Sequence, residues 1–145
     1  MLKVKTYLDC STTHGIGLFA GEDIAAGAEI WEFNPKIDLT FSPSQWGEIM
    51  KSLVPAGRNT LRRYSYKENG SYCLCLDNAQ FMNHSQDCCN VGNDKAKDVM
   101  FALVDIRNGE ELLCNYRDYS DWDDAHLRCL CPCEPLSAGG VSKES

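Results

Sequence analysis

One short pattern occurs twice in this chain and restricts the kind of fold that it can adopt. Residues 23–30 and 105–112 share the order Asp-Ile-x-x-Gly-x-Glu-aliphatic. Apolar residues around a two-residue turn followed by glycine are typical of a hairpin closed by a glycine in the left-handed region. Because two copies are too few for a stacked repeat protein, we expect two similar hairpins in one β-rich domain.

The length and the charge of the chain limit its class and its partners. With 145 residues it has the size of one ordinary domain. The 21 acidic and 14 basic residues give a net charge of −7, which argues against a nucleic-acid-binding surface and favours a cationic partner. No run approaches the roughly 18 apolar residues that cross a bilayer, and residues 1–10 lack the apolar region of a secretory signal. We therefore expect a soluble intracellular domain, cytoplasmic or nuclear, without direct contact with nucleic acid or membrane; the oligomeric state stays open.

Local patterns predict a few further elements. Residues 45–53 form the best helix candidate, because a proline suits the turn before them and their apolar side chains share one face. Residues 72–76 and 99–106 are expected to be strands, the second an interior strand since it is nearly all apolar. Residues 86–98 are polar and contain glycine, which predicts a loop. Residues 58–70 are basic and aromatic and indicate no single conformation.

Two glycines, Gly15 and Gly17, flank Ile16 shortly after an alternating segment, residues 2–9, that predicts a half-buried strand. Glycine lets a backbone approach a ligand closely and turn sharply beside it. The third glycine and the helix of a dinucleotide-binding fingerprint are missing. Taken alone, the pair is therefore more typical of a plain glycine turn than of a ligand site.

Two more motifs carry polar side chains at the ends of expected strands. Asn83 and His84 follow an apolar approach, and their amide and imidazole groups can hold a polar ligand or a crossing backbone. Tyr116 ends the strand expected from the second repeat, and a strand tyrosine usually packs its ring and finds one hydrogen bond. Taken singly, each motif is more typical of a structural role.

Together and in this order, the glycine pair, Asn-His-Ser and Glu-Leu-x-x-x-Tyr resemble the SET domain, a family of S-adenosylmethionine-dependent protein lysine methyltransferases. The resemblance extends over roughly residues 8–122, most of the chain, and includes the hairpin pattern after each motif. It implies a mainly β fold, the β-clip, with short strands in several small sheets, a pseudoknot-like C-terminal segment and a short helical insert near residues 39–69. It also implies a SET domain over residues 1–122, a post-SET-like cysteine segment over 123–133 and a disordered tail over 134–145.

The resemblance implies a binding site for S-adenosylmethionine. The main chain of residues 15–17 would approach the methionine part of this cofactor. Asn83 and His84 would hold its adenine and amino ends, largely through main-chain contacts, and Trp122 would pack on the adenine ring. Tyr116 would also belong to this site, beside the transferred methyl group.

The resemblance further implies methyl transfer to the side-chain amine of a lysine in a protein substrate. Tyr116 would orient the amine, and Tyr64 would line the lysine channel, with Tyr66 or Tyr72 as alternatives. The family chemistry relies on positioning the two reactants in line, so no dedicated general base is required. Net negative charge favours a lysine within a basic segment, as in a histone or another basic protein.

Three positions depart from the family pattern. Gln80 stands where an arginine is frequent, Cys114 stands where an aromatic residue is frequent, and residues 86–90 replace the usual sequence after Asn-His-Ser. These departures leave open an alternative function, a catalytically weak or inactive SET-like module that binds cofactor or peptide.

Nine cysteines without an export signal predict thiols or a metal site rather than a disulfide framework. Many family members bind zinc between the Asn-His-Ser loop and a cysteine-rich C-terminal segment. The corresponding residues here are Cys88, or Cys89 in its place, Cys129, Cys131 and Cys133. The last spacing has one residue where four are expected, so zinc binding, a zinc-organised interaction protein and a reduced thiol cluster all stay open. The remaining cysteines, expected as buried groups in strands, are Cys10, Cys73, Cys75 and Cys114.

Overall fold

The computed structural model describes residues 1–121, and in this range the fold is mainly β, as predicted. Short strands dominate, and two α-helices and two 3-10 turns connect them. The strands are β1 (Thr6–Cys10), β2 (Ile16–Ala20), β3 (Glu29–Glu32), β4 (Leu39–Phe41), β5 (Ser65–Glu68), β6 (Ser71–Leu74), β7 (Asn83–His84), β8 (Val91–Asp94), β9 (Val99–Ala102) and β10 (Leu113–Cys114). The helices are α1 (Pro43–Ser52) and α2 (Pro55–Tyr64), and the 3-10 turns are η1 (Asn78–Phe81) and η2 (Tyr116–Asp118).

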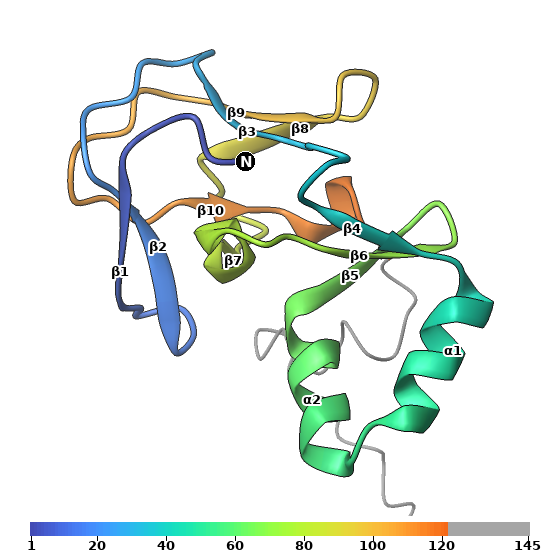
Figure 1. The fold of residues 1–145 in the computed structure, drawn as a ribbon. Helices are drawn as coiled ribbons and strands as arrows, with labels where there is room; N and C mark the ends of the chain where they lie inside the picture. The colour runs from blue at the N-terminus through green and yellow to red at the C-terminus, as the bar shows by residue number, and fades with distance from the viewer. Residues whose placement is uncertain (122–145) are drawn as a thin grey trace, which may run out of the picture.

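The strands form three small sheets around one core (Figure 1). The largest sheet has the order β3-β9-β8-β10-β7, the second contains β1 and β2, and the third has the order β4-β6-β5. Both α-helices extend from the third sheet, on the side away from the β1–β2 ribbon (Figure 1). The largest fully buried side chains are Leu18, Ile30, Val91, Ile106, Leu112 and Cys114.

The two copies of the repeated pattern pair with one another, so the prediction of two separate hairpins is wrong. The main chains of Ile24 and Ile106 exchange two hydrogen bonds of 2.8 Å. The side chains of Asp23 and Asp105 each accept a 2.8 Å hydrogen bond from a main-chain N–H of the opposite copy. Each copy contains a turn but no second strand of its own, and the opposite copy supplies the partner that its backbone groups need.

The glycine of each copy has the conformation that the sequence predicts. Gly27 and Gly109 have φ angles of 81° and 94°, which residues with a side chain rarely adopt. The paired turns bring the beginning and the end of the domain together, and the N–H of Leu112 donates to the carbonyl of Leu18 at 2.7 Å. As a result, the segment that ends in Tyr116 lies beside the strand that follows the glycine pair.

The first predicted helix is confirmed, and a second helix follows it directly. Ser42 and Gln45 form a capping box at the start of α1, where side chain and main chain bond reciprocally. Trp46 is buried and stacks on Tyr72 with ring centroids 4.8 Å apart. Pro55 ends this helical segment and occupies the first turn of α2, where its missing N–H is tolerated. Neither helix within residues 1–121 is long and apolar enough to cross a membrane.

One local prediction is corrected by the structure. The segment predicted as a loop contains β8, which pairs with β9 and makes β9 the interior strand that the sequence indicates. Gly92 in β8 is buried, and a methyl group built on it would lie 2.8 Å from the side chain of Leu103. A glycine that signals a loop in the sequence therefore serves close packing between strands.

Candidate functional site

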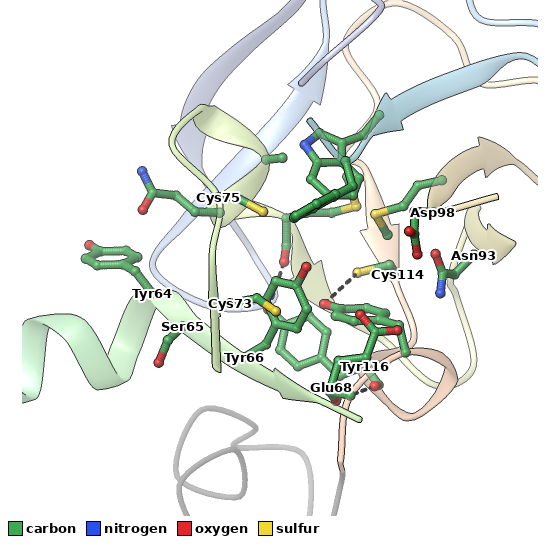
Figure 2. A pocket seen from close by; sticks show the side chains of 18 of the residues that line it. Tyr64, Ser65, Tyr66, Glu68, Cys73, Cys75, Asn93, Asp98, Cys114 and Tyr116 are labelled. Carbon is green, nitrogen blue, oxygen red and sulfur yellow. Dashed lines mark hydrogen bonds between the residues drawn. The ribbon is translucent and has the colours of Figure 1, made fainter. Parts of the chain in front are cut away.

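A cavity of about 310 Å³ lies between the third sheet, β3 and the residues that follow β10. This volume is at the lower end of the range for small-molecule sites. Figure 2 shows Tyr64 and Ser65 on one side of the cavity, Asp98 and Asn93 on the other, and Tyr116 near its centre. The apolar and aromatic side chains of the wall include Trp31, Phe33, Tyr66, Met82, Met100, Cys114 and Tyr119.

Three tyrosine rings form one part of the cavity wall. The rings of Tyr66 and Tyr119 have centroids 5.3 Å apart and planes at 88°. The rings of Tyr116 and Tyr119 are 5.9 Å apart at 67°. Burial, above all, raises the pKa of the Tyr66 and Tyr119 hydroxyl groups well above the ordinary range of tyrosine. These two side chains therefore stay neutral, and neutral aromatic faces attract cations.

The position of Tyr116 is set by hydrogen bonds to the Asn-His motif. Its hydroxyl group donates to the carbonyl oxygen of Met82 at 2.8 Å. Its main-chain N–H donates to Nδ1 of His84 at 3.0 Å. Because the hydroxyl proton is used in the bond to Met82, the hydroxyl oxygen can act toward other groups only as an acceptor.

His84 is held in its neutral form. Desolvation lowers the pKa of its imidazole from the ordinary value, and the positive charge of Arg117 lowers it further. The main chain of Cys114 and the charge of Asp118 oppose this shift. A neutral ring is required for the observed contact, because an unprotonated Nδ1 accepts the hydrogen bond from the main-chain N–H of Tyr116.

Acidification is expected to destabilise the fold through His84. The pKa of this side chain is lower in the folded state than the unfolded value of 6.5. Its contribution is therefore present above about pH 6.5 and is lost as the pH falls below that value. Urea unfolding between about pH 7.5 and pH 5.5 should show a smaller pH slope for His84→Gln than for the wild type.

The matched control for this prediction is His14→Gln. The side chain of His14 forms no hydrogen bond with another residue of the described part of the chain, so this variant should keep the wild-type slope. Equal slopes in the wild type and in His84→Gln would contradict the role assigned to His84.

Asn83 joins the two other motifs. Its Nδ2 atom donates to the carbonyl oxygens of His14 and Ile16 at 3.0 and 3.3 Å, and to Oε1 of Glu111 at 2.9 Å. The side chain is buried, so these bonds form where an unpaired amide would be costly. Through them, Asn83 determines the position of the glycine turn relative to the last strand.

Gly17 permits a close approach within the chain itself. A methyl group built on Gly17 would lie 2.2 Å from Oε1 of Glu111. The other carboxylate oxygen accepts a hydrogen bond from Oγ of Ser11 at 2.9 Å. Glycine is required at this position because a carboxylate packs against its α-carbon. The approach of a cofactor to the main chain of residues 15–17 stays a prediction.

The three tyrosines predicted as candidates for the lysine channel lie in different environments. Tyr64 lines the cavity, but its ring packs edge-on against Phe81 at 5.5 Å. Tyr66 also lines the cavity and contacts the Tyr116 cluster through Tyr119. Tyr72 stacks on Trp46 instead. Of the two predicted channel tyrosines that line the cavity, Tyr66 belongs to the cluster around Tyr116.

Several predicted residues lie outside the described part of the chain, namely Trp122, Cys129, Cys131 and Cys133. The remaining predicted zinc ligand, Cys88, is exposed, and its main-chain N–H donates to Oγ of Ser85. Within residues 1–121, no group of three or more His, Cys, Asp or Glu side chains is placed to hold a metal ion. The zinc site stays a prediction.

The four cysteines expected to be buried differ in their environments. Cys73 and Cys114 are buried, and Cys75 is partly buried. Cys10 is exposed on β1, which corrects the prediction, because this strand lies at the edge of a two-stranded sheet. Burial raises the pKa of the Cys114 thiol to about 12, so the thiol stays protonated and its sulfur acts as an apolar part of the cavity wall.

Sequence reasoning did not assign roles to three groups of the site. Glu111 connects Asn83 with Ser11, the carbonyl of Met82 holds the Tyr116 hydroxyl, and Tyr119 completes the aromatic wall. Glu111 stands inside the Glu-Leu motif, so its place in the pattern was a usable signal. A main-chain carbonyl leaves no signal in a sequence.

Comparisons with known proteins support these observations. The family model of the SET domain matches residues 15–117. A Plasmodium falciparum protein described as a candidate histone methyltransferase has a similar structure, with 22% identity, coverage of 83% of this chain and 99% of the other, and a TM-score of 0.53. No curated protein matched the sequence.

Larger proteins share the same fold. A chain of the Chaetomium thermophilum polycomb repressive complex 2, in an autoinhibited conformation bound to S-adenosylmethionine, has 22% identity and a TM-score of 0.61. The match covers 83% of this chain but 16% of that one. A humanised mutant of the same complex bound to an inhibitor has 23% identity and a TM-score of 0.58, with 81% and 15% covered. At this identity, the likeness is one of fold.

Proposed function

This chain belongs to the SET-domain family, and on that basis we propose that it transfers a methyl group from S-adenosylmethionine to the side-chain amine of a lysine in a protein. The observation that carries the proposal is the placement of Tyr116. Its hydroxyl oxygen faces a cavity with aromatic walls, and His84 and Met82 hold it there.

The groups that line the cavity suit a cationic, partly polar methyl donor. The aromatic wall of Tyr66 and Tyr119 suits a positively charged sulfonium group. Trp31 also lines the cavity, and its buried Nε1–H has no hydrogen-bond partner within the described residues, so a ligand acceptor would satisfy it. When bound, the cofactor would supply a methyl group activated for transfer to a nucleophile.

Tyr116 would orient the lysine amine. Its proton is donated to the Met82 carbonyl, so its oxygen can only accept, which matches the N–H groups of a neutral amine. The carbonyl oxygen and the hydroxyl oxygen together would also accept weak hydrogen bonds from a polarised methyl group. Both contacts would align the amine with the methyl group. Such alignment of two bound reactants can contribute roughly 7–11 kcal/mol to catalysis.

The cavity would also favour the neutral form of the substrate amine. A lysine with a pKa near 10.4 must lose its proton before it can act as a nucleophile. The apolar wall formed by Met82 and Met100 would lower the pKa of a buried amine by desolvation. His84 cannot serve as the base through Nδ1, because the Tyr116 main chain occupies that atom.

The substrate is proposed to be a lysine within a basic segment of an intracellular protein such as a histone. Two carboxylates, Glu68 and Asp98, lie at the cavity wall, and the whole chain has a net charge of −7. Both features attract a cationic segment during the encounter.

Binding and transfer of labelled methyl groups test this function. The full chain is expected to bind S-adenosylmethionine with a micromolar dissociation constant in calorimetry, and Asn83→Ala should weaken binding because it releases the glycine turn from Glu111. With lysine-containing histone peptides, the label should appear on a lysine. Absence of both cofactor binding and label transfer in correctly folded protein would refute the proposal.

A further inference from the structure

Strand β1 has one edge without a hydrogen-bonding partner among the described residues. It pairs with β2 on one side, and it is the outer strand of that two-stranded ribbon (Figure 1). The other edge of β2 is occupied, because its main chain bonds to residues 110–112. An unpaired strand edge is a template for pairing with another chain.

The unpaired main-chain groups of β1 belong to alternate residues. The carbonyl of Lys5 and the N–H of Ser11 form bonds of 2.8 Å to the residues at the two ends of β2. In this antiparallel ladder, the main-chain groups of the odd-numbered residues of β1 therefore point to β2. Those of Thr6 and Leu8 point the opposite way, and within residues 1–121 they form no hydrogen bond. Both residues are thus able to pair with a further strand.

Two opposite charges lie on one face of β1, on either side of Tyr7. Lys5, Tyr7 and Asp9 are alternate residues, so their side chains share a face. All three are exposed. The ammonium group of Lys5 lies 3.9 Å from Glu22, but 81% of the Lys5 side chain is accessible, and a pair of this kind contributes little. Asp9 forms no ion pair with another described residue.

We propose that β1 pairs antiparallel with β1 of a second copy of this chain, in the register that places Tyr7 on the two-fold axis. In this register Thr6 lies opposite Leu8 of the second copy, so their outward N–H and carbonyl groups can bond to each other. Each Lys5 lies opposite Asp9 of the second copy, and the two-fold axis repeats the contact. Opposite charges that face each other directly stabilise a strand pair. This interface does not depend on the proposed function.

Neighbouring registers lack the match of charges. With Leu8 on the axis, Lys5 would face Ser11 of the second copy, and with Thr6 on the axis it would face Tyr7. The two charges are placed symmetrically about Tyr7, so an antiparallel copy of the same strand presents each charge with its opposite. For this reason the charge pattern selects a second copy over an unrelated strand, which would leave both charges unpaired.

The test reverses single charges and measures the molar mass of the full chain by sedimentation equilibrium. The wild type is expected to form a dimer with a dissociation constant on the order of 10–100 μM, since one short strand buries a small interface. Lys5→Glu and Asp9→Lys each place like charges opposite one another at both ends of the strand pair. Each should raise the dissociation constant by about 10- to 30-fold.

The matched control is Lys36→Glu. It makes the same change of charge at an exposed residue between β3 and β4, so it should dimerise as the wild type does.

An equimolar mixture of Lys5→Glu and Asp9→Lys tests the register itself. In a pair of one copy of each, the new carboxylate at position 5 faces the new ammonium at position 9, and the other end keeps the original Lys5 and Asp9. The mixture should therefore dimerise at concentrations at which neither variant does so alone.

Three results would overturn the proposal. The first is a wild type that stays monomeric up to about 1 mM. The second is a dimer that Lys5→Glu weakens no more than Lys36→Glu does, because the interface would then lie elsewhere. The third is a mixture that stays monomeric, because the two charges would then not face each other. Thermal melting of each variant identifies a loss that comes from unfolding, and the two variants test the same contact from its two sides.

Discussion

Replacing Tyr116 with phenylalanine is expected to reduce the rate of methyl transfer by on the order of 100-fold, because misplacing a reacting group by about 1 Å has an effect of that size. The substitution removes one oxygen and keeps the ring. It deletes both the bond to the Met82 carbonyl and the acceptor that faces the cavity. The His84 contact uses the main chain of Tyr116 and persists.

The measurement separates catalysis from binding. The rate constant of transfer should fall in Tyr116→Phe, whereas the dissociation constant of S-adenosylmethionine should change little. Tyr72→Phe is the matched control, since it makes the same chemical change at a ring that stacks on Trp46. An unchanged rate in Tyr116→Phe would refute the role of its hydroxyl group. A wild type that binds the donor but transfers nothing would point to a SET-like binding module.

The second large effect concerns the contact between Gly17 and Glu111. Gly17→Ala is expected to lower the free energy of unfolding by about 2–3 kcal/mol, because the new methyl group overlaps a carboxylate that Asn83 and Ser11 hold. Glu111→Ala is expected to lower it by a similar amount, since it leaves the buried amide of Asn83 without its charged partner.

A double-mutant cycle tests whether the two effects share one cause. In the double variant Gly17→Ala and Glu111→Ala, the overlap is gone, so the total loss should be smaller than the sum of the single losses by about 1–2 kcal/mol. Urea unfolding supplies the four free energies. Gly47→Ala is the control, because a methyl group there meets nothing within 4 Å. It should raise stability by about 0.5–1 kcal/mol, since it lies within α1. Strictly additive losses would contradict the direct contact.

The amino-acid sequence predicted local features of the fold. The proline and the capping residues predicted α1, because such signals act over three or four neighbouring residues. The glycines of the repeated pattern predicted left-handed turns, and Gly27 and Gly109 adopt them. What the pattern could not reveal is that each turn pairs with the other copy, since a turn specifies its own backbone and not its partner.

In the candidate site, too, some residues were predicted from the sequence and others were not. The order of the three motifs predicted that Tyr116 and the Asn-His pair belong to one site, and β7 and β10 pair in parallel so that Leu113 lies opposite Asn83 and Cys114 opposite His84. No role was predicted for Tyr119 or for the carbonyl of Met82. Side chains of many types can pack beside a tyrosine ring, and every residue has a main-chain carbonyl, so neither contact is marked in the sequence.

The sequence by itself determined the family, the motif residues and the elements that depend on near neighbours. Only the tertiary structure decided that Gly17 is required by Glu111, and that Cys10 is exposed while Cys114 is buried. These features depend on contacts between residues far apart in the chain. Which distant residues meet is decided by how all the elements pack into one core, and no local pattern contains that information.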